Sequence, residues 1–380
     1  MSFSLRYALS ACAAAAALAG CDPKDGAKEL EQGRAAYELR DLKKAERLFE
    51  KCLGYAPSNV DALVYLARTK LDLGEVAAAR DWIGKAAELA GGDLDVRLVR
   101  AQVAWHAKEF DEAAKLYSGI AGDEALGAET CAEGWVGVGI VEMGRERRDL
   151  ARVALLRAIR LDRRNASAWY HLGLLYRDSF RYLDAALEQF EIFVRLEESA
   201  DMRVQRVQRT TIPNLKEEIA RRDMELPGVS KRDSAASAVA LAKGDEAAKK
   251  GVFKTAREHY RAALEADPLS YPAAMGLAKA WQASDPTPAG QRKALDNYCV
   301  ACSLRPSSVK TFLTAGAFAS KIGSFAQAVE IYSRAVAANP TSVEALDGLV
   351  RALQRVGGRR SDAQAYQQYR DSLVAVRRKK

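Results

Sequence analysis

The fold is decided by the 34 residues from Val309 to Ser342, which read VKTFLTAGAFASKIGSFAQAVEIYSRAVAANPTS. Two stretches with apolar residues at helical spacing are joined by a Gly323-Ser324 turn. Pro340 cannot continue a helix, so it ends the unit. Small residues allow two antiparallel helices to approach closely, and aromatic residues fill the seam between them: Gly316, Ala328, Ala335, Phe312 and Tyr332.

The same pattern recurs through most of the chain. When Val309 is counted as position 1, position 20 is an alanine nine times, and the successive gaps are 34, 34, 38, 35, 70, 38, 34 and 35 residues. One gap is close to two periods and the others are close to one. A glycine twelve residues before this alanine and a proline twelve residues after it recur in the same register. Such self-similarity predicts a solenoid of stacked helical hairpins. The alanines are Ala45, Ala79, Ala113, Ala151, Ala186, Ala256, Ala294, Ala328 and Ala363.

With these columns in register, the chain resembles the tetratricopeptide repeat (TPR) family. The resemblance implies an all-α, right-handed α-solenoid of helix-turn-helix units, with about nine repeats over this length. The composition agrees, since 49% of the residues are hydrophobic and no strand-like alternating segment stands out. Repeat five has one extra residue before Ala186, and repeat seven has an insertion at Asp285–Pro288 between its helices.

The array is interrupted between Ser199 and Ser234. The charge-rich stretch Met202–Arg222 is expected to be partly helical, with Pro213 interrupting it. It is either a degenerate repeat or a hinge, and an irregular helical connector is the favoured interpretation. The predicted organisation is therefore a leader at 1–20, an N-terminal block of about five repeats at 21–198, the connector at 199–236, and a C-terminal block of about four repeats with a polar capping helix at 237–380.

The N-terminus has the pattern of an export signal. An apolar run from Tyr7 to Leu18 is too short to cross a bilayer as a mature helix. It ends in Leu18-Ala19-Gly20-Cys21, which resembles the lipobox of bacterial lipoproteins, where the cysteine thiol carries the lipid. The resemblance implies a lipid anchor at Cys21 and a periplasm-facing place in a bacterial cell envelope. Asp22 resembles a signal for retention in the inner membrane, although the outer membrane stays open. The alternative is an alanine-rich helix that ends in cysteine by chance.

Nothing in the sequence indicates catalysis, a cofactor or a metal. The net charge of +8 is modest for 380 residues and is interspersed, which argues against a nucleic-acid binder. The glycine string around Gly139 has no preceding strand, so it does not predict nucleotide binding. Cys299 and Cys302 lie inside a predicted helix with no second pair to complete a zinc site. The three histidines fall in three different repeats.

The remaining candidate for function is a surface. The TPR resemblance implies a concave groove lined by the first helix of each repeat, chiefly at positions 2, 5, 9, 12 and 13. Aromatic residues beside arginines are the types that carry binding hot spots, although ordinary solvated helix faces would look the same. The candidate groove residues are Arg34, Tyr37, Arg68, Gln102, Trp105 and His106 from repeats one to three, and Tyr170 and Arg177 from repeat five.

These features predict a non-enzymatic, lipid-anchored scaffold or adaptor whose groove binds a protein or peptide partner during assembly, secretion or polymer export. The lysine and asparagine clamp of chaperone-binding TPR proteins is not reproduced in register, which argues against an adaptor for chaperone C-terminal tails. The alternative is a carbohydrate- or peptidoglycan-binding lipoprotein, in which Trp105, Trp169 and Tyr170 would stack on sugar rings. An enzyme would need an active-site constellation that the sequence does not contain. The oligomeric state stays open.

Overall fold

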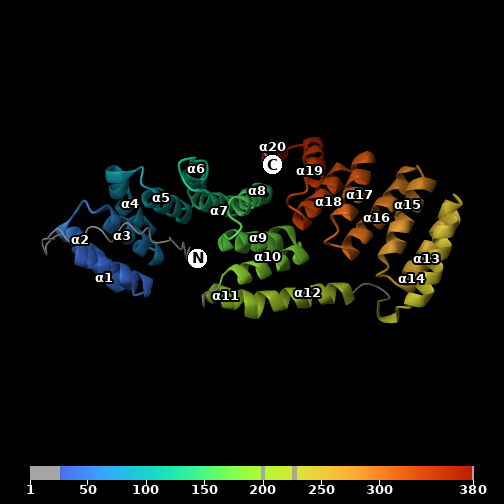
Figure 1. Ribbon diagram of the computed structural model, residues 1–380, viewed down its shortest axis with the longest axis horizontal. Coiled ribbons are helices and arrows are strands. Elements are labelled where there is room, and N and C mark those ends of the chain that lie inside the picture. Colours follow the sequence, from blue (N-terminus) through green and yellow to red (C-terminus); the bar gives the residue numbers. More distant parts are fainter. Residues whose placement is uncertain (1–25, 198–201, 225–228, 379–380) are drawn as a thin grey trace. The chain divides into compact units, whose positions relative to one another are not determined.

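The computed structural model describes residues 26–197, 202–224 and 229–378. The predicted leader, Cys21 and Asp22 lie outside these residues. Over the described ranges the chain consists of helices joined by short turns, with no strand among them, and consecutive helices pack in pairs (Figure 1). The predicted all-α solenoid of helical hairpins is confirmed.

The chain divides into two compact units, Met1–Glu146 and Arg147–Lys380. The division falls between the two helices of predicted repeat four, inside the predicted block 21–198. In the first unit every helix packs on the next one along the chain. Its helices are α1 (Ala27–Glu38), α2 (Leu42–Tyr55), α3 (Val60–Asp72), α4 (Val76–Ala90), α5 (Leu94–His106), α6 (Phe110–Ala121) and α7 (Ala128–Gly144).

The second unit contains the remaining helices. They are α8 (Arg148–Leu161), α9 (Ala166–Leu175), the π-helix η1 (Tyr176–Phe180), α10 (Leu183–Leu196), α11 (Met202–Arg206), the π-helix η2 (Val207–Thr211), α12 (Ile212–Met224), the 3-10 helix η3 (Val229–Lys231), α13 (Ser234–Lys249), α14 (Phe253–Ala266), α15 (Tyr271–Ser284), α16 (Pro288–Leu304), α17 (Val309–Lys321), α18 (Phe325–Ala338), α19 (Val343–Arg355) and α20 (Arg360–Arg378).

The repeats are held in register by aromatic rings that lodge between two glycines. A Cβ atom on Gly316 would lie 2.8 Å from the Tyr332 ring, and one on Gly348 of the following repeat would lie 2.3 Å from it. Tyr260 lies in the same way between Gly244 and Gly276, at 2.7 and 2.5 Å. Because no side chain fits at these distances, the second glycine of each pair fixes how closely one repeat stacks on the next.

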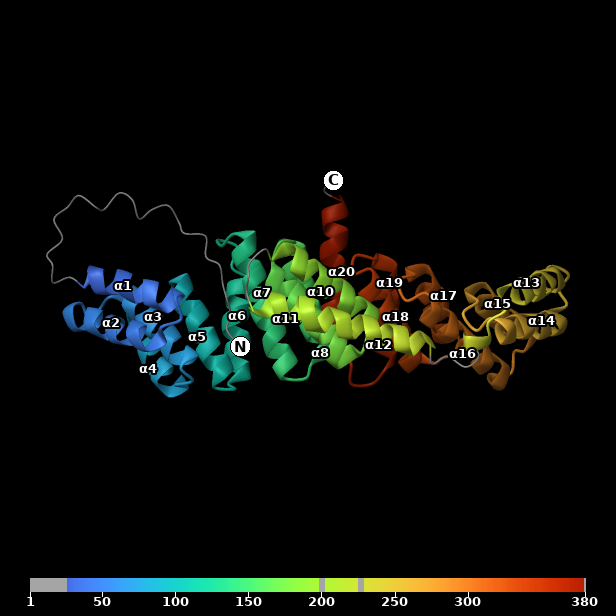
Figure 2. The same ribbon diagram turned by 90° about the horizontal axis from the view of Figure 1, so that it is seen from below.

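Two π-helical turns absorb the irregularities that the sequence shows. The extra residue of repeat five is taken up by η1, after which Arg181 adopts the left-handed conformation with φ 57°. In the connector, η2 precedes α12, and the amide of Ile212 donates to the carbonyl of Val207, one residue further back than in an α-helix. The predicted interruption at Pro213 is therefore not found, since the wider turn carries the helix past a residue with no N–H to donate. Figure 2 shows the resulting rod of α11 and α12 lying along α10.

The last helix does not end the second unit as a polar cap. Helix α20 packs on α19 of its own repeat and also on α8, at the start of the unit. It contributes Ala363, Tyr366 and Tyr369, which are all at most 3% exposed. The first and last helices of the second unit thus cover one another.

Candidate functional site

The first helices of repeats one to three share one surface of the first unit, here named the α1–α3–α5 face. It carries six of the eight residues that the sequence proposes for a groove, together with one that the sequence did not single out. Its members are Arg34, Tyr37, Tyr65, Arg68, Gln102, Trp105 and His106.

Tyr65 is the centre of this face. The Arg34 guanidinium carbon lies 5.0 Å from the centroid of the Tyr65 ring, and that of Arg68 lies 5.5 Å from it. Tyr37 meets the ring edge-on at 6.0 Å, and Phe49 stacks beneath it at 5.5 Å. Cation–π contacts and aromatic packing fix both arginines over one aromatic platform. The sequence missed Tyr65 because position 6 is not among the groove positions of the family.

Ion pairs tie each repeat of this face to the next. The arginine at position 9 of one repeat meets the aspartate at position 2 of the following repeat: Arg34 with Asp61 at 2.5 Å, and Arg68 with Asp95 at 2.7 Å. Pairs that are partly exposed contribute about 0–1 kcal/mol each. Their main effect is to hold the guanidinium groups over Tyr65. A carboxylate of a partner would have to compete with these aspartates, whereas a neutral group would not.

The far end of the face has an unused hydrogen-bond donor. The Nε1 atom of Trp105 is covered and has no acceptor in the described part of the chain. The indole meets the His106 ring edge-on at 4.8 Å. Burial lowers the pKa of His106, so the imidazole stays neutral at pH 7. Gln102 lies one helical turn away on α5. This end offers donors and neutral polar groups without a fixed charge.

Tyr170 and Arg177 belong to the second unit and form a separate group. The Tyr170 ring packs against Phe193 at 5.1 Å and His171 at 5.2 Å. The Arg177 guanidinium pairs with the neighbouring Asp178 at 2.6 Å. On α9, the Trp169 Nε1 atom donates to the carbonyl of Arg163 at 2.9 Å. The rings proposed for sugar stacking in this unit are therefore engaged within the fold.

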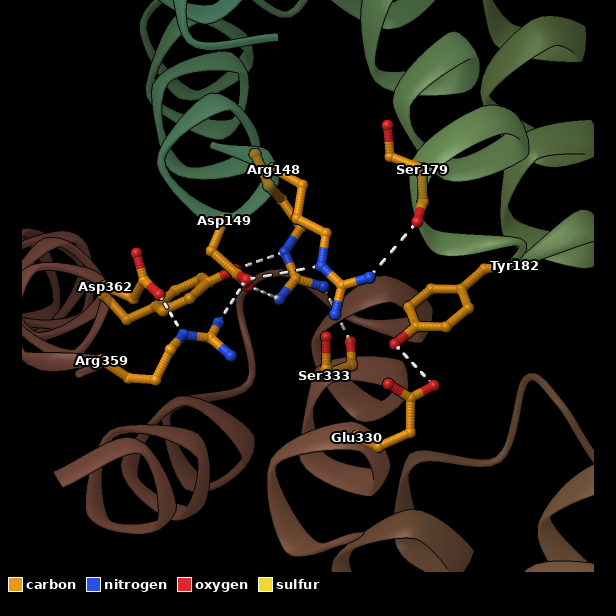
Figure 3. Close-up of polar contacts among 10 residues, drawn as sticks. Arg148, Asp149, Ser179, Tyr182, Glu330, Ser333, Arg359 and Asp362 are labelled. Atoms are coloured by element: carbon orange, nitrogen blue, oxygen red, sulfur yellow. Dashed lines mark hydrogen bonds and ion pairs between the residues drawn. The ribbon is translucent and has the colours of Figure 1, made fainter. Parts of the chain in front are cut away.

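A second polar cluster joins α8 to α20 and α18, and is here named the α8–α20 clasp (Figure 3). Arg152 is 0% exposed. Its Nε donates to Tyr366 Oη at 2.5 Å, and its terminal nitrogens donate to Asp149 and to the Ser333 carbonyl, both at 3.1 Å. Asp149 also accepts from Tyr366 at 2.8 Å and from Arg359 at 2.6 Å. Every member of the clasp has a partner, as a buried charge requires.

The charges of the clasp are fixed by its geometry. Burial alone would lower the pKa of Arg152, but the oxygens of Tyr366 and Asp149 outweigh it and raise that pKa. Burial raises the pKa of Tyr366, so its hydroxyl stays neutral. The Arg152 guanidinium also lies 4.4 Å from the Phe180 ring centroid. The cluster can hold helices together, and it offers neither a nucleophile nor a titrating acid or base near neutral pH.

Two cysteines of the second unit are the other candidates for reactivity. Cys299 and Cys302 are free thiols, and burial raises the pKa of both, that of Cys302 to about 12. They therefore stay protonated at neutral pH. Over residues 26–197, 202–224 and 229–378 there is no group of three or more histidine, cysteine, aspartate or glutamate side chains that could hold a metal ion. In the same ranges, every helix is too short or too polar to span a bilayer.

Comparisons with known proteins agree with this architecture. Family models described as tetratricopeptide repeats match residues 29–88, 139–201 and 241–297. No curated protein matches the chain.

Among solved structures, PilF of Pseudomonas aeruginosa has 14% identity and a TM-score of 0.40, over 66% of this chain and 95% of that one. A thermophilic TPR protein of Thermus thermophilus has 22% identity and a TM-score of 0.43, over 50% and 98%. YrrB, described as a TPR protein with an unusual peptide-binding site, has 15% identity and a TM-score of 0.34, over 49% and 93%. With its repeats matched by these family models and folded as stacked helical hairpins, the chain is a tetratricopeptide repeat protein.

Proposed function

We propose that this protein is a lipid-anchored scaffold in a bacterial cell envelope and that it binds an extended segment of a protein partner on the α1–α3–α5 face. TPR proteins are typically non-catalytic interaction scaffolds, which is the coarse function that the family supports. The observation that carries the proposal is the Tyr65 platform, on which two arginines from successive repeats are held over one ring.

The chemistry of the face favours a peptide backbone as the bound group. The covered Trp105 Nε1 lacks an acceptor among the residues that the structure describes, and a buried donor left unpaired costs about 1–3 kcal/mol. The carbonyl of an extended peptide would supply that acceptor. Tyr65, Tyr37 and the stems of the arginines offer apolar area for its side chains. Because both arginines already have aspartate partners, we expect a partner segment that is neutral or only weakly acidic.

The anchor in this proposal is Cys21. Two or three acyl chains on this residue give stable attachment, whereas one chain is marginal. The scaffold would then face the periplasm from the inner or the outer membrane, with Asp22 favouring the inner one. The pathways that fit are assembly, secretion or polymer export at the envelope.

The face is tested by crosslinking in cells followed by mass spectrometry of what is captured. The triple variant Arg34→Ala, Arg68→Ala and Trp105→Ala should keep its helicity and lose the partner. A matched control changes two arginines and a tryptophan on the second helices of the same unit: Arg47→Ala, Arg80→Ala and Trp82→Ala. Unchanged capture by the first variant, or equal loss in both, removes this face from the proposal.

The anchor is tested separately by fractionation. Cys21→Ser should move the protein from the membrane pellet to the soluble envelope fraction, with the partner still captured there. If the variant stays in the pellet, lipidation at Cys21 is not what holds the protein.

Carbohydrate binding is the alternative function. In the second unit Trp169 donates to a backbone carbonyl and Tyr170 packs against Phe193, whereas Trp105 of the first unit keeps a donor without an acceptor among the described residues. A pull-down with peptidoglycan would detect it directly.

A further inference from the structure

The second unit contains a cavity of about 360 Å³ that is open to solvent. One wall comes from the turn after η1, the first turns of α10 and Arg222 of α12. The other comes from the end of α16, the turn after it, and α17 and α18. Cavities of about 300–1,000 Å³ are the usual size of sites for small ligands and side chains. The two walls come from distant parts of the sequence, as the hydrogen bond between Tyr182 and Glu330 shows, with a separation of 148 residues.

The interior of the cavity is mainly apolar. Its base is formed by three apolar side chains that are themselves buried and therefore packed in place: Leu183, Phe312 and Ala337. Ala338 and Pro306 complete this side with small, rigid surfaces. Such a lining removes apolar area of a ligand from water, which stabilises binding by about 25 cal/mol per Å².

The charged residues that line the cavity differ in whether they have an ion-pair partner. Each arginine of the lining has a carboxylate partner of its own: Arg181 with Glu218 at 3.0 Å, Arg222 with Asp184 at 2.9 Å, and Arg334 with Glu330 at 3.3 Å. Glu188 also lines the cavity, but it has no hydrogen bond or ion pair in the described part of the chain. The charged residues that act on it electrostatically are Glu191 and Arg195 of its own helix. Glu188 is an exposed residue at the rim of the cavity. Desolvation by the wall beside it raises the pKa of its carboxyl, with a smaller contribution from Glu191, and Arg195 opposes the shift.

We propose that this cavity binds a short apolar peptide segment bearing a lysine or arginine, with the cationic group at Glu188 and the apolar side chain against Leu183 and Phe312. A cation supplies the partner that Glu188 lacks, and it disturbs none of the three arginine pairs. An acidic ligand would meet an unpaired carboxylate at the same place. This site lies in the second unit, so it goes beyond the α1–α3–α5 face and does not depend on it.

The cavity is also linked to the clasp. Tyr182 and Arg334 line the cavity, the Arg334 guanidinium lies 5.3 Å from the Tyr182 ring centroid, and the Tyr182 hydroxyl donates to Glu330 on α18. Figure 3 shows Tyr182 and Glu330 beside the residues that join α8 to α20. Since a ligand touching both walls binds only when the walls are together, it stabilises the closed unit through linkage.

The test is calorimetric titration of the full chain with a blocked leucine–lysine dipeptide. Blocked leucine–glutamine and leucine–glutamate dipeptides serve as probes of equal size without the cation. The lysine peptide should bind at least tenfold more tightly than either, and it should slow amide exchange in α20. Glu188→Gln should remove the preference for lysine. Glu191→Gln, one turn away at a residue paired with Lys216 at 3.0 Å, should keep most of the preference, although Glu191 also acts on Glu188 electrostatically.

Ala338→Leu places a larger side chain in the cavity and should weaken all three peptides together, with an unchanged circular dichroism spectrum. If that variant does not fold, the preference for the lysine peptide and its loss in Glu188→Gln still test the proposal. Equal affinity for the three peptides, no binding of any of them, or the same loss in Glu191→Gln overturns the proposal. Capture of a partner by the α1–α3–α5 face is unaffected in each case, so the two proposals fail separately.

Discussion

Arg152→Met is the most direct test of what closes the second unit. Methionine keeps a long, flexible side chain in the same space and removes the charge and the donors. In the native clasp, Arg152 donates to Tyr366 at 2.5 Å and to Asp149 and the Ser333 carbonyl at 3.1 Å. After the change, Asp149 keeps Arg359 at 2.6 Å and Tyr366 at 2.8 Å, while the carbonyl of Ser333 loses this donor.

The size of the effect follows from these contacts. Removal of one partner from a buried ion pair costs about 3–5 kcal/mol, because the other charge is left uncompensated. Here a second cation, Arg359, still compensates Asp149, which places the expected loss near the lower end, at about 3 kcal/mol. A loss of this size corresponds to roughly a hundredfold change in an opening equilibrium. The change acts on the contact between α8 and α20, so local opening of α20 should precede unfolding of the repeats.

The assay is hydrogen exchange read by mass spectrometry. Amides of α20 should exchange roughly a hundredfold faster in Arg152→Met, while peptides from α1 to α6 keep their native rates. Arg160→Met is the matched control, since Arg160 lies on the same helix and donates to the Ser372 carbonyl of α20 at 3.1 Å but is exposed. It should change exchange by only a few-fold. Native protection of α20 in Arg152→Met, or an equal effect in Arg160→Met, would show that the buried ion pair does not hold the unit closed.

Two further outcomes follow from the same structure. Gly348→Ala places a Cβ atom 2.3 Å from the Tyr332 ring and should cost about 1–3 kcal/mol in urea unfolding, whereas Gly357→Ala, with open space around it, should be nearly neutral. His171 has its pKa lowered to about 4, chiefly by burial, whereas in the unfolded chain it titrates near its ordinary value of 6.5. The unfolded chain therefore binds the proton first, and stability that is complete above about pH 6.5 is lost as the pH falls toward 4, by on the order of 2 kcal/mol. His171→Gln should flatten the melting temperature over this range, and an unchanged slope would contradict the reasoning.

The repeat architecture could be read from the sequence because each hairpin packs on its neighbours. The columns of alanine and glycine report contacts within about one repeat, so a one-dimensional pattern is enough to place them. The second glycine of each pair that encloses an aromatic ring, such as Gly348, also recurs with the repeat. It could have been found by aligning the repeats at position 6. The π-helical turn η1 is also visible in retrospect as the single extra residue of repeat five.

The clasp and the cavity could not be found in this way. Arg152 and Tyr366 lie 214 residues apart, and nothing local to either residue indicates the other. From the sequence alone, Arg152 would be placed on the exposed side of an amphipathic helix. Tyr366 and Tyr369 would be placed on the face of α20 that packs against its own repeat. Only the packing of the last helix on the first one of the unit makes these residues buried.

The closure also explains why the contact between α8 and α20 contains an ion pair. The end of a solenoid normally needs a polar face, because its outer helix has no neighbour. Helix α20 instead buries Tyr366 and Tyr369, and it packs on α8 as well as on α19. An apolar contact between two helices could shift by a turn with little loss, since ridges and grooves repeat along both. The three directed bonds of Arg152 to Tyr366, Asp149 and the Ser333 carbonyl are satisfied in one register alone. The buried charge therefore selects the position of the last helix.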